Sequence, residues 1–559
     1  MLRDHAIRKP GLKTRLAMTV GWKRSTEALR HGPKSPDQLD AAQTTMPYYR
    51  VTAGGCAPEH CGDRICNCLR SGGRGGARAT ISIRMPRFFL AALSVLVVAG
   101  CAVRPVNPPL ESVAQDVPYR VERTDQDEQQ KKNLVILAFS GGGTRAAAFS
   151  YGVLEALKRT EAVRPDGKKG RLLDQVDMIT GVSGGSFTAL AYKLYGDRLF
   201  EEYEKRFLKR NVQGELIARA LDPTNWGSLL STGWGRSEMA ADLYDEILFN
   251  GATFDDLEKN GGPAIGVNAT DITSGARVVF TKANFDVFCT DIGSFRIARA
   301  AAASSAVPVV LSPLTINNYG GSCNYTIPPW AKLFLDNPNP PRPASRVVAR
   351  LREMTNLADG AEPYLHLVDG GVSDNVGLRG VLDMINLMEA LREAGFRTPL
   401  DHVKKIIVIV VNSLSIPATD WAQREDPPGT VSVLIKAAGV PIDRYSGEQI
   451  DQLKDMQARW HMLRQVRDTA SFNKGDETSR QAAQHYAKNV PDAEIYPIDV
   501  SFSALDDLAE REYLNQLPTS FVLNDEDVDR LRTAAGKILL SSPDFQRLLK
   551  DLGARTVDQ

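Results

Sequence analysis

Two apolar segments of this sequence each end in a glycine turn that leads directly into a helical pattern. The first is NLVILAFS (133–140), followed by GGG (141–143) and a helical stretch over about 144–159. The second is VDMITGV (176–182), followed by Ser183, two glycines and another helical stretch. A buried strand that turns tightly into a helix is the repeating unit of parallel α/β sheets. This arrangement constrains the fold more than any other feature of the chain.

Further strands are expected along the rest of the body, with helical stretches between them. They are AIGVNATD (264–271), RVVFTKA (277–283), YLHLVDG (364–370), KKIIVIVVNS (404–413) and AEIYPIDVSF (493–502). The pattern predicts an α/β fold with a largely parallel sheet covered by helices on both faces. We expect one large domain with its core over 131–415. Residues 416–559 are predicted to be a mainly helical C-terminal extension packed on the same domain.

The first 84 residues differ in composition from the rest of the chain. They are rich in Gly, Arg and Pro and carry a net charge of +9, whereas residues 85–559 carry −8. Four of the seven cysteines lie here, at Cys56, Cys61, Cys66 and Cys68. Their spacing is not a usual zinc pattern, although His60 is nearby, so no metal site is predicted. The mildly acidic body gives no reason to expect nucleic-acid binding.

MPRFFLAALSVLVVAGC, which starts at residue 85, predicts an export signal. Its apolar stretch, 88–100, is too short to span a bilayer as a helix and has the length of a signal-peptide core. The small residues before Cys101 resemble the lipobox of bacterial lipoproteins, in which the cysteine is lipidated and becomes the mature N-terminus. A buried helix is the alternative. Because an export signal belongs at the N-terminus, residues 1–84 are interpreted as a disordered or wrongly assigned leader, and 85–100 as a signal peptide.

The residues after this signal are predicted to attach the protein to a membrane. Residues 101–130 contain several prolines and a charged run, which is typical of a tether between a lipid anchor and a folded body. Beyond Cys101 the chain holds two more cysteines, Cys289 and Cys323. An exported protein can join two such thiols in a disulfide. The sequence leaves open whether they lie within bonding distance.

GVSGG (181–185) fits the pattern G-x-S-x-G at the end of a predicted strand. Open α/β sheets place their sites at the carboxyl ends of their strands. In a nucleophile elbow, Gly181 and Gly185 would give the strand and the helix room to pack around a strained Ser183. The alternative is a tight turn with no catalytic role. The position between a strand and a helix favours the elbow.

The second motif is the glycine loop after the first predicted strand. It consists of Gly141, Gly142, Gly143, Thr144 and Arg145. Glycines at the start of a helix leave backbone amides free to meet an anion, such as the oxyanion of an acyl-transfer reaction. The same letters fit the dinucleotide fingerprint G-x-G-x-x-A. That fingerprint needs an acidic residue at the end of the next strand, where this sequence has GVS instead.

The third motif is Asp369-Gly370-Gly371, which also ends a predicted strand. It would supply a carboxylate base for the serine, or form only a turn. A Ser-His-Asp triad is a further alternative. The histidines are His5, His31, His60, His366, His402, His461 and His485. Positions 366 and 369 face opposite sides of a strand, and His402, His461 and His485 lie in polar contexts without a motif.

In this order, the three motifs resemble the patatin-like phospholipase family, in its bacterial, lipoprotein-type form. NATDITSGARVVF (268–280), AAAASSAVPVVLSPL (300–314) and the C-terminal YLNQLPTSFVLNDEDVDRLRTAAGKILL also fit. The resemblance implies that Ser183 is the nucleophile and Asp369 the general base of a Ser-Asp dyad. The glycine loop would form the oxyanion hole. The implied reaction cleaves fatty-acyl esters of (phospho)lipids through an acyl-enzyme and needs no cofactor.

The membrane prediction and the family resemblance together imply a place of action. With Cys101 lipidated, membrane lipids would serve as substrate and as anchor surface in a bacterial cell envelope. With Ala102 after the cysteine, the sequence resembles those of lipoproteins that are sorted to the outer membrane. A different class of function is a scaffold lipoprotein that keeps this fold without turnover, and three intact motifs argue against it. The oligomeric state, the head group and the acyl chain are left open.

Overall fold

The computed structural model describes residues 104–113, 133–163, 167–229, 231, 234–339, 344–468, 481 and 489–557. The chain divides into two units, 1–83 and 84–559, and every described residue belongs to the second. The predicted leader, the signal peptide and Cys101 lie outside the described residues. Within the described residues, no helix has both the length and the apolar composition needed to cross a bilayer.

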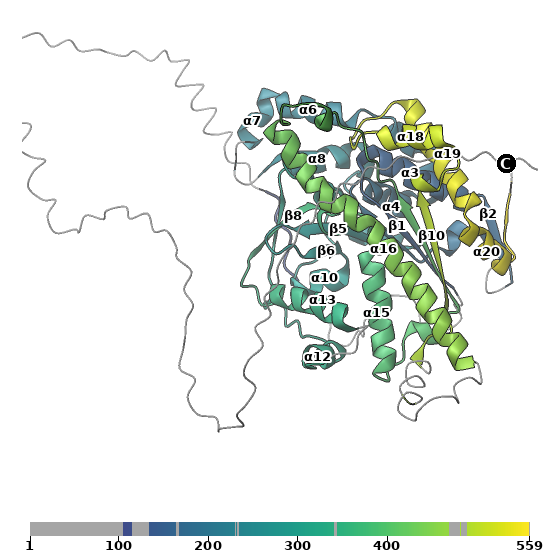
Figure 1. Ribbon diagram of the computed structural model, residues 1–559. Helices are drawn as coiled ribbons and strands as arrows, with labels where there is room; N and C mark the ends of the chain where they lie inside the picture. Colours follow the sequence, from purple (N-terminus) through teal and green to yellow (C-terminus); the bar gives the residue numbers. More distant parts are fainter. Residues whose placement is uncertain are drawn as a thin grey trace, which may run out of the picture. The chain divides into compact units, whose positions relative to one another are not determined.

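An eight-stranded sheet lies at the centre of the body (Figure 1). Its order is β10-β9-β1-β4-β5-β8-β7, and β6 pairs with β5. The strands from β10 to β5 are parallel, whereas β6 and β8 run antiparallel to β5, and β7 antiparallel to β8. The bounds are β1 (Asn133–Phe139), β4 (Met178–Val182), β5 (Ala264–Asp271), β6 (Arg277–Phe280), β7 (Leu314–Asn317), β8 (Tyr364–Asp369), β9 (Lys405–Asn412) and β10 (Glu494–Ser501). The predicted largely parallel sheet is confirmed, and β7 is a strand that the sequence did not predict.

Successive side chains of the central strands enter two different hydrophobic cores. Leu137 and Ile409 belong to the core that α3, α4 and α19 share, and Ile136 and Val408 belong to the core under α15 and α16. A strand that is covered on both faces must be apolar at every position, because its side chains alternate between the faces. This requirement explains the unbroken apolar runs of β1 and β9 and confirms the predicted fold class.

The helices form the two layers that cover the sheet. The longer ones are α3 (Gly143–Lys158), α4 (Gly184–Tyr195), α6 (Val212–Leu221), α8 (Arg236–Tyr244), α11 (Ile297–Ser304), α13 (Ala344–Leu357), α15 (Arg379–Glu393), α16 (Thr430–Asp468), α18 (Leu508–Gln516), α19 (Asp525–Ser541) and α20 (Pro543–Leu552). The shorter ones are α5 (Leu199–Tyr203), α7 (Pro223–Leu229), α9 (Phe254–Lys259), α10 (Lys282–Val287), α12 (Pro329–Leu335) and α14 (Gly371–Asp374). A small second sheet consists of β2 (Thr160–Val163), β3 (Lys169–Arg171) and β11 (Arg555–Thr556).

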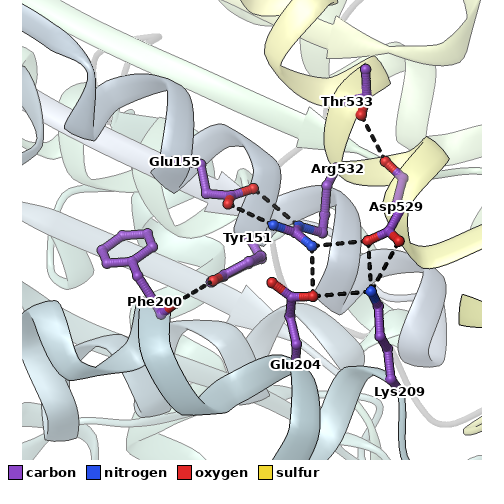
Figure 2. A network of polar contacts seen from close by, with 8 residues as sticks. All are labelled: Tyr151, Glu155, Phe200, Glu204, Lys209, Asp529, Arg532 and Thr533. Atoms are coloured by element: carbon purple, nitrogen blue, oxygen red, sulfur yellow. Dashed lines mark hydrogen bonds and ion pairs between the residues drawn. The ribbon is translucent and has the colours of Figure 1, made fainter. Parts of the chain in front are cut away.

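The C-terminal extension is joined to the rest of the body by main-chain pairing and by charged groups. Strand β10 pairs with β9 along its whole length, and α19 lies against α3. Figure 2 shows the polar network between these helices. Arg532 of α19 reaches Glu155 of α3 at 2.8 Å and Glu204 at 2.7 Å, and Lys209 links Glu204 to Asp529. The extension is mainly helical, as predicted, and these contacts join it to the rest of the body.

Part of the predicted tether is docked on the body. The amide of Leu110 donates to the carbonyl of Cys289 at 2.7 Å, and the amide of Val113 donates to the carbonyl of Cys323 at 3.1 Å. Cys289 and Cys323 themselves form a disulfide. Residues 104–113 thus follow a defined path across both cysteines, where the sequence predicted only a tether.

Loss of this disulfide is expected to reduce the free energy of unfolding by roughly 3–4 kcal/mol, because it closes a loop with a sequence separation of 34. The measurement is urea unfolding of the parent protein and of the variant with Cys289→Ser and Cys323→Ser. The loop contains α11, which contacts the candidate site described below. A loss below about 1 kcal/mol would mean that the docked segment holds the loop closed without the disulfide.

Candidate active site

Ser183 occupies a strained turn between β4 and α4. Its φ of 47° and ψ of −121° lie in a region that side chains other than glycine rarely adopt, at a cost of about 1–3 kcal/mol. The turn is held by its own amide, which donates to Ser304 Oγ at 2.8 Å. The Ser304 hydroxyl in turn donates to the carbonyl of Asn268 at 2.7 Å. This geometry agrees with the elbow that the sequence predicted, and the Ser183 side chain is 4% exposed.

The elbow glycines lie where the chain crosses itself closely. A Cβ atom at Gly185 would lie 2.6 Å from the carbonyl oxygen of Ser140, and one at Gly181 would lie 2.7 Å from the Cα atom of Ser186. Both distances are shorter than any side chain tolerates, and both neighbours are backbone atoms that cannot swing aside. The motif glycines are therefore required for the packing of α4 against the ends of β1 and β4.

Asp369 reaches the serine because β8 runs antiparallel to β5, with Asp369 opposite Ala269. One carboxylate oxygen accepts a hydrogen bond from the amide of Gly371 at 2.8 Å, and the carboxyl group lies beside the Ser183 side chain. Burial raises the pKa of Asp369 from 3.8 to about 6, although the Gly371 amide and the Ser183 side chain act to lower it. The side chain is 7% exposed. The structure thus pairs the serine with a buried carboxyl that titrates near neutral pH.

The glycine loop presents fewer free amides than the sequence predicted. The amide of Gly141 donates to the carbonyl of Asn375 at 2.9 Å, and that of Thr144 donates to the carbonyl of Ser520 at 2.8 Å. No described residue accepts from the amides of Gly142 and Gly143, whose φ angles are 141° and 61°. The amides of Gly142 and Gly143 are therefore the remaining candidate oxyanion donors, because the flanking amides are already hydrogen-bonded to other segments of the chain.

Arg145 lies inside the body and makes contacts that hold the glycine loop in place. Its Nε donates to the carbonyl of Ser413 at 2.8 Å and its Nη1 to the carbonyl of Leu517 at 2.9 Å. Its Nη2 donates to Thr519 Oγ1 at 3.0 Å. The guanidinium therefore connects the start of α3 to the segments after β9 and before α19. These contacts indicate a structural role for Arg145.

Several residues that hold the site were not singled out from the sequence. They are Asn268, Ser304, Asn375, Ser413 and Ser520, which bind the backbone or the side chains of the three motifs. Three of them lie in stretches already tied to the family, NATDITS, AAAASS and LPTSF. These stretches were the part of the sequence that could have indicated the supporting residues. Their partners lie up to several hundred residues away, so no local pattern could assign the contacts.

The described body histidines do not build a triad with Ser183. His366 is exposed on β8, and its Nδ1 lies 3.0 Å from Thr315 Oγ1. His402 is exposed, and His461 is exposed and paired with Gln465. His485 lies outside the described residues. Among the described residues, the titratable group beside Ser183 is thus the Asp369 carboxyl and not an imidazole.

Comparisons with known proteins give a family match and matches to solved structures at low sequence identity. The model of the patatin-like phospholipase family matches residues 137–382. No curated protein matches the sequence. Human GIVD cytosolic phospholipase A2 is similar in structure, with a TM-score of 0.36 and 13% identity over 78% of this chain and 61% of that chain. The present chain thus spans less than two thirds of that enzyme.

A second solved structure is the ExoU–SpcU complex of the type III secretion system of Pseudomonas aeruginosa. It has a TM-score of 0.17 and 15% identity, over 64% of this chain and 74% of that chain. The matched range 137–382 contains the glycine loop, the elbow with Ser183, and the Asp369 turn. Over residues 137–382, which are less than half of its length, the chain is similar to the patatin-like phospholipase family.

Proposed function

We propose that this protein is a membrane-anchored serine acyl hydrolase that cleaves fatty-acyl esters of (phospho)lipids through a Ser183–Asp369 dyad. The match of residues 137–382 to the patatin-like phospholipase family supports lipid acyl hydrolysis in general. The observation that carries the finer proposal is the buried carboxyl of Asp369 beside the strained Ser183. A scaffold would need neither the strained serine nor a buried carboxyl beside it, since both reduce stability.

In the first step, the Ser183 hydroxyl attacks the ester carbonyl while the Asp369 carboxylate accepts its proton. The oxygen of the tetrahedral intermediate becomes negative and meets the amides of Gly142 and Gly143. The intermediate then collapses, and Asp369 returns the proton to the leaving alcohol. Water repeats the sequence on the acyl-enzyme: Asp369 takes its proton, a fatty acid leaves, and the serine regains its hydrogen.

The proposed location is a bacterial cell envelope, with the outer membrane as the favoured membrane. The support is the lipobox-like sequence that ends in Cys101, with Ala102 after it. The mass of the protein purified from membranes of its producing cells tests this part separately. A product that begins at Cys101 and carries the added mass of acyl chains is expected. A product that keeps residues 1–84, or an unmodified Cys101, would contradict the anchor and leave the hydrolase proposal unaffected.

Labelling with a serine-directed fluorophosphonate separates an enzyme from a scaffold. The parent protein should be labelled, and labelling should disappear in Ser183→Ala. Release of fatty acid from phospholipid vesicles then tests the substrate class, with neutral lipids and a soluble ester as further substrates. Absence of both labelling and release in a folded protein would favour the scaffold.

The hydrolysis rate is expected to rise with pH through a value of about 6, because Asp369 must be a carboxylate to accept the serine proton. Burial raises the pKa of this carboxyl, so the protonated, inactive form persists to a higher pH than for an exposed aspartate. A pH profile of kcat/KM on a soluble ester measures the value in the free enzyme. A rate that is already constant at pH 4.5 would show that the base is not a buried carboxyl of this kind.

A further inference from the structure

The segment that follows Cys101 is docked on the outer strands of the sheet by side chains as well as by its backbone. Asn107 is buried, and its side chain donates to the carbonyl of Asn317 at 3.0 Å and accepts from the amide of Asn317 at 2.7 Å. Arg104 donates to the side chain of Asn317 and lies over the ring of Tyr364, 5.4 Å from its centroid. Arg104 is therefore held at the edge formed by β7 and β8.

Very little chain separates this docked residue from the predicted lipid anchor. Arg104 is the third residue after Cys101, and each residue spans at most about 3.3–3.6 Å. Whatever path the two intervening residues take, the Cα atoms of Cys101 and Arg104 lie within about 11 Å of each other. Acyl chains on Cys101 would therefore bring this edge of the sheet to the membrane surface.

The register of the strands shows at which end of the strands Tyr364 and the docked segment lie. Leu367 of β8 is opposite Asp271, the last residue of β5. Tyr364 is three residues before Leu367. Because β8 runs antiparallel to β5, Tyr364 lies beyond the carboxyl end of β5. The carboxyl ends of the parallel strands point in this direction, and Ser183 follows the carboxyl end of β4. The docked segment and the candidate nucleophile therefore both lie at the carboxyl ends of the parallel strands.

Exposed side chains around the docked segment have the character of a membrane interface. Val106, Ile272 and Tyr364 are 55%, 50% and 51% exposed. Ile272 is bound next to β8, because its amide donates to the carbonyl of His366 at 2.9 Å. Aliphatic residues and a tyrosine beside an arginine suit the boundary between acyl chains and anionic head groups.

We propose that the β7–β8 edge, with Val106, Ile272, Tyr364 and Arg104 at its surface, is the face that this protein presents to a lipid bilayer. The proposal rests on the anchoring at Cys101 in the proposed function. The short connection to a docked segment fixes the orientation of the body, which a free tether would not do. The carboxyl ends of the parallel strands, where Ser183 lies, then face the lipid, so that ester substrates enter from the bilayer.

The test attaches Cys101 to a membrane chemically, so that it does not depend on natural lipidation. The full chain is prepared with Cys56, Cys61, Cys66 and Cys68 replaced by serine. Cys101 is then the free thiol, because Cys289 and Cys323 form the disulfide. Coupling uses a maleimide lipid in vesicles of ether-linked phospholipids, which contain no acyl ester to hydrolyse. Hydroxyl-radical footprinting then compares the oxidation of single residues in the bound and the free protein.

The two residues to compare lie near opposite edges of the sheet, one on a strand and the other on a covering helix. Tyr364 belongs to β8, and Met462, which is 58% exposed, belongs to the part of α16 that packs against β10 (Figure 1). We expect the oxidation of Tyr364 to fall several-fold on vesicles, while that of Met462 stays unchanged. Equal protection of the two residues, or protection of Met462 alone, would overturn the proposed orientation.

A matched pair of insertions tests whether the short connection causes the orientation. About 12 Gly/Ser residues, with an r.m.s. span of about 20 Å, are placed either between Val103 and Arg104 or after Val113. The first insertion should remove the protection of Tyr364, and the second should preserve it. Protection that survives the first insertion would overturn the role of the docked segment. Hydrolysis of a soluble ester by each protein reports separately on the proposed function.

Discussion

Ser183→Ala should lower fatty-acid release by at least about 10³-fold, because the acyl-enzyme cannot form without this hydroxyl. Asp369→Asn should lower it by about 10²–10⁴-fold, because an amide cannot accept the serine proton. The measurement is release from phospholipid vesicles, with each variant at the same concentration as the parent protein. The two effects should not add in the double variant, because both residues act in one proton transfer.

A control variant distinguishes the dyad from a triad. His366→Ala changes an exposed histidine that lies near Asp369 in sequence and contacts Thr315 instead. Its rate should equal that of the parent protein, and a loss of 10²-fold or more would restore the Ser-His-Asp interpretation. Ser183→Ala with full activity would refute the proposed nucleophile.

Thermal unfolding is expected to show that Asp369→Asn acts on chemistry and not on folding. The folded pKa of about 6 lies above the ordinary 3.8, so the native state binds this proton more tightly than the unfolded state does. Burial of the carboxyl therefore costs stability as pH rises from 3.8 to about 6, and the full cost is present at neutral pH. Asparagine carries no charge, so the variant should unfold at neutral pH at a temperature no lower than the parent.

Alanine at Gly143 or at Gly184 is expected to be the most damaging glycine substitution near the site. A Cβ atom at Gly143 would lie 2.2 Å from the carbonyl oxygen of Ser520, and one at Gly184 would lie 1.9 Å from the carbonyl oxygen of Gly143. Gly143 also has a φ of 61°. Each substitution must push two backbone segments apart, which should cost about 3 kcal/mol or more. Displacement of the loop amides should also reduce the rate by about 10²-fold or more.

Gly447→Ala is the matched control for these substitutions. Gly447 lies inside α16, and a Cβ atom there would meet nothing within 4 Å. Alanine is favoured over glycine in a helix by up to about 1 kcal/mol, so this variant should be as stable as the parent protein or more stable. Thermal unfolding and ester hydrolysis of the three variants give the comparison. Parent-like activity in Gly143→Ala would mean that the loop has room that the structure does not show.

Local patterns were sufficient to predict the fold class and the three motifs. The apolar runs of β1 and β9 and the glycine turns after two strands depend on neighbours in the chain, and the structure has them where they were expected. Strand β7, with four residues, was not predicted. Its pattern is short, and its pairing with β8 joins segments about 50 residues apart.

The finer properties of the site depend on contacts between distant parts of the chain. The amide of Thr144 donates to the carbonyl of Ser520, and the amide of Gly141 donates to the carbonyl of Asn375. Two of the expected oxyanion donors are therefore already hydrogen-bonded. The raised pKa of Asp369 comes from burial, which only the folded body creates. Residues 104–113 form a docked segment because Asn317, more than 200 residues later, supplies its partners. The sequence alone therefore identified the candidate catalytic groups, through local strand and turn patterns and the family resemblance that these motifs carry. The tertiary structure decided which of these groups are free, charged or held in place, because those properties arise from neighbours that no local pattern contains.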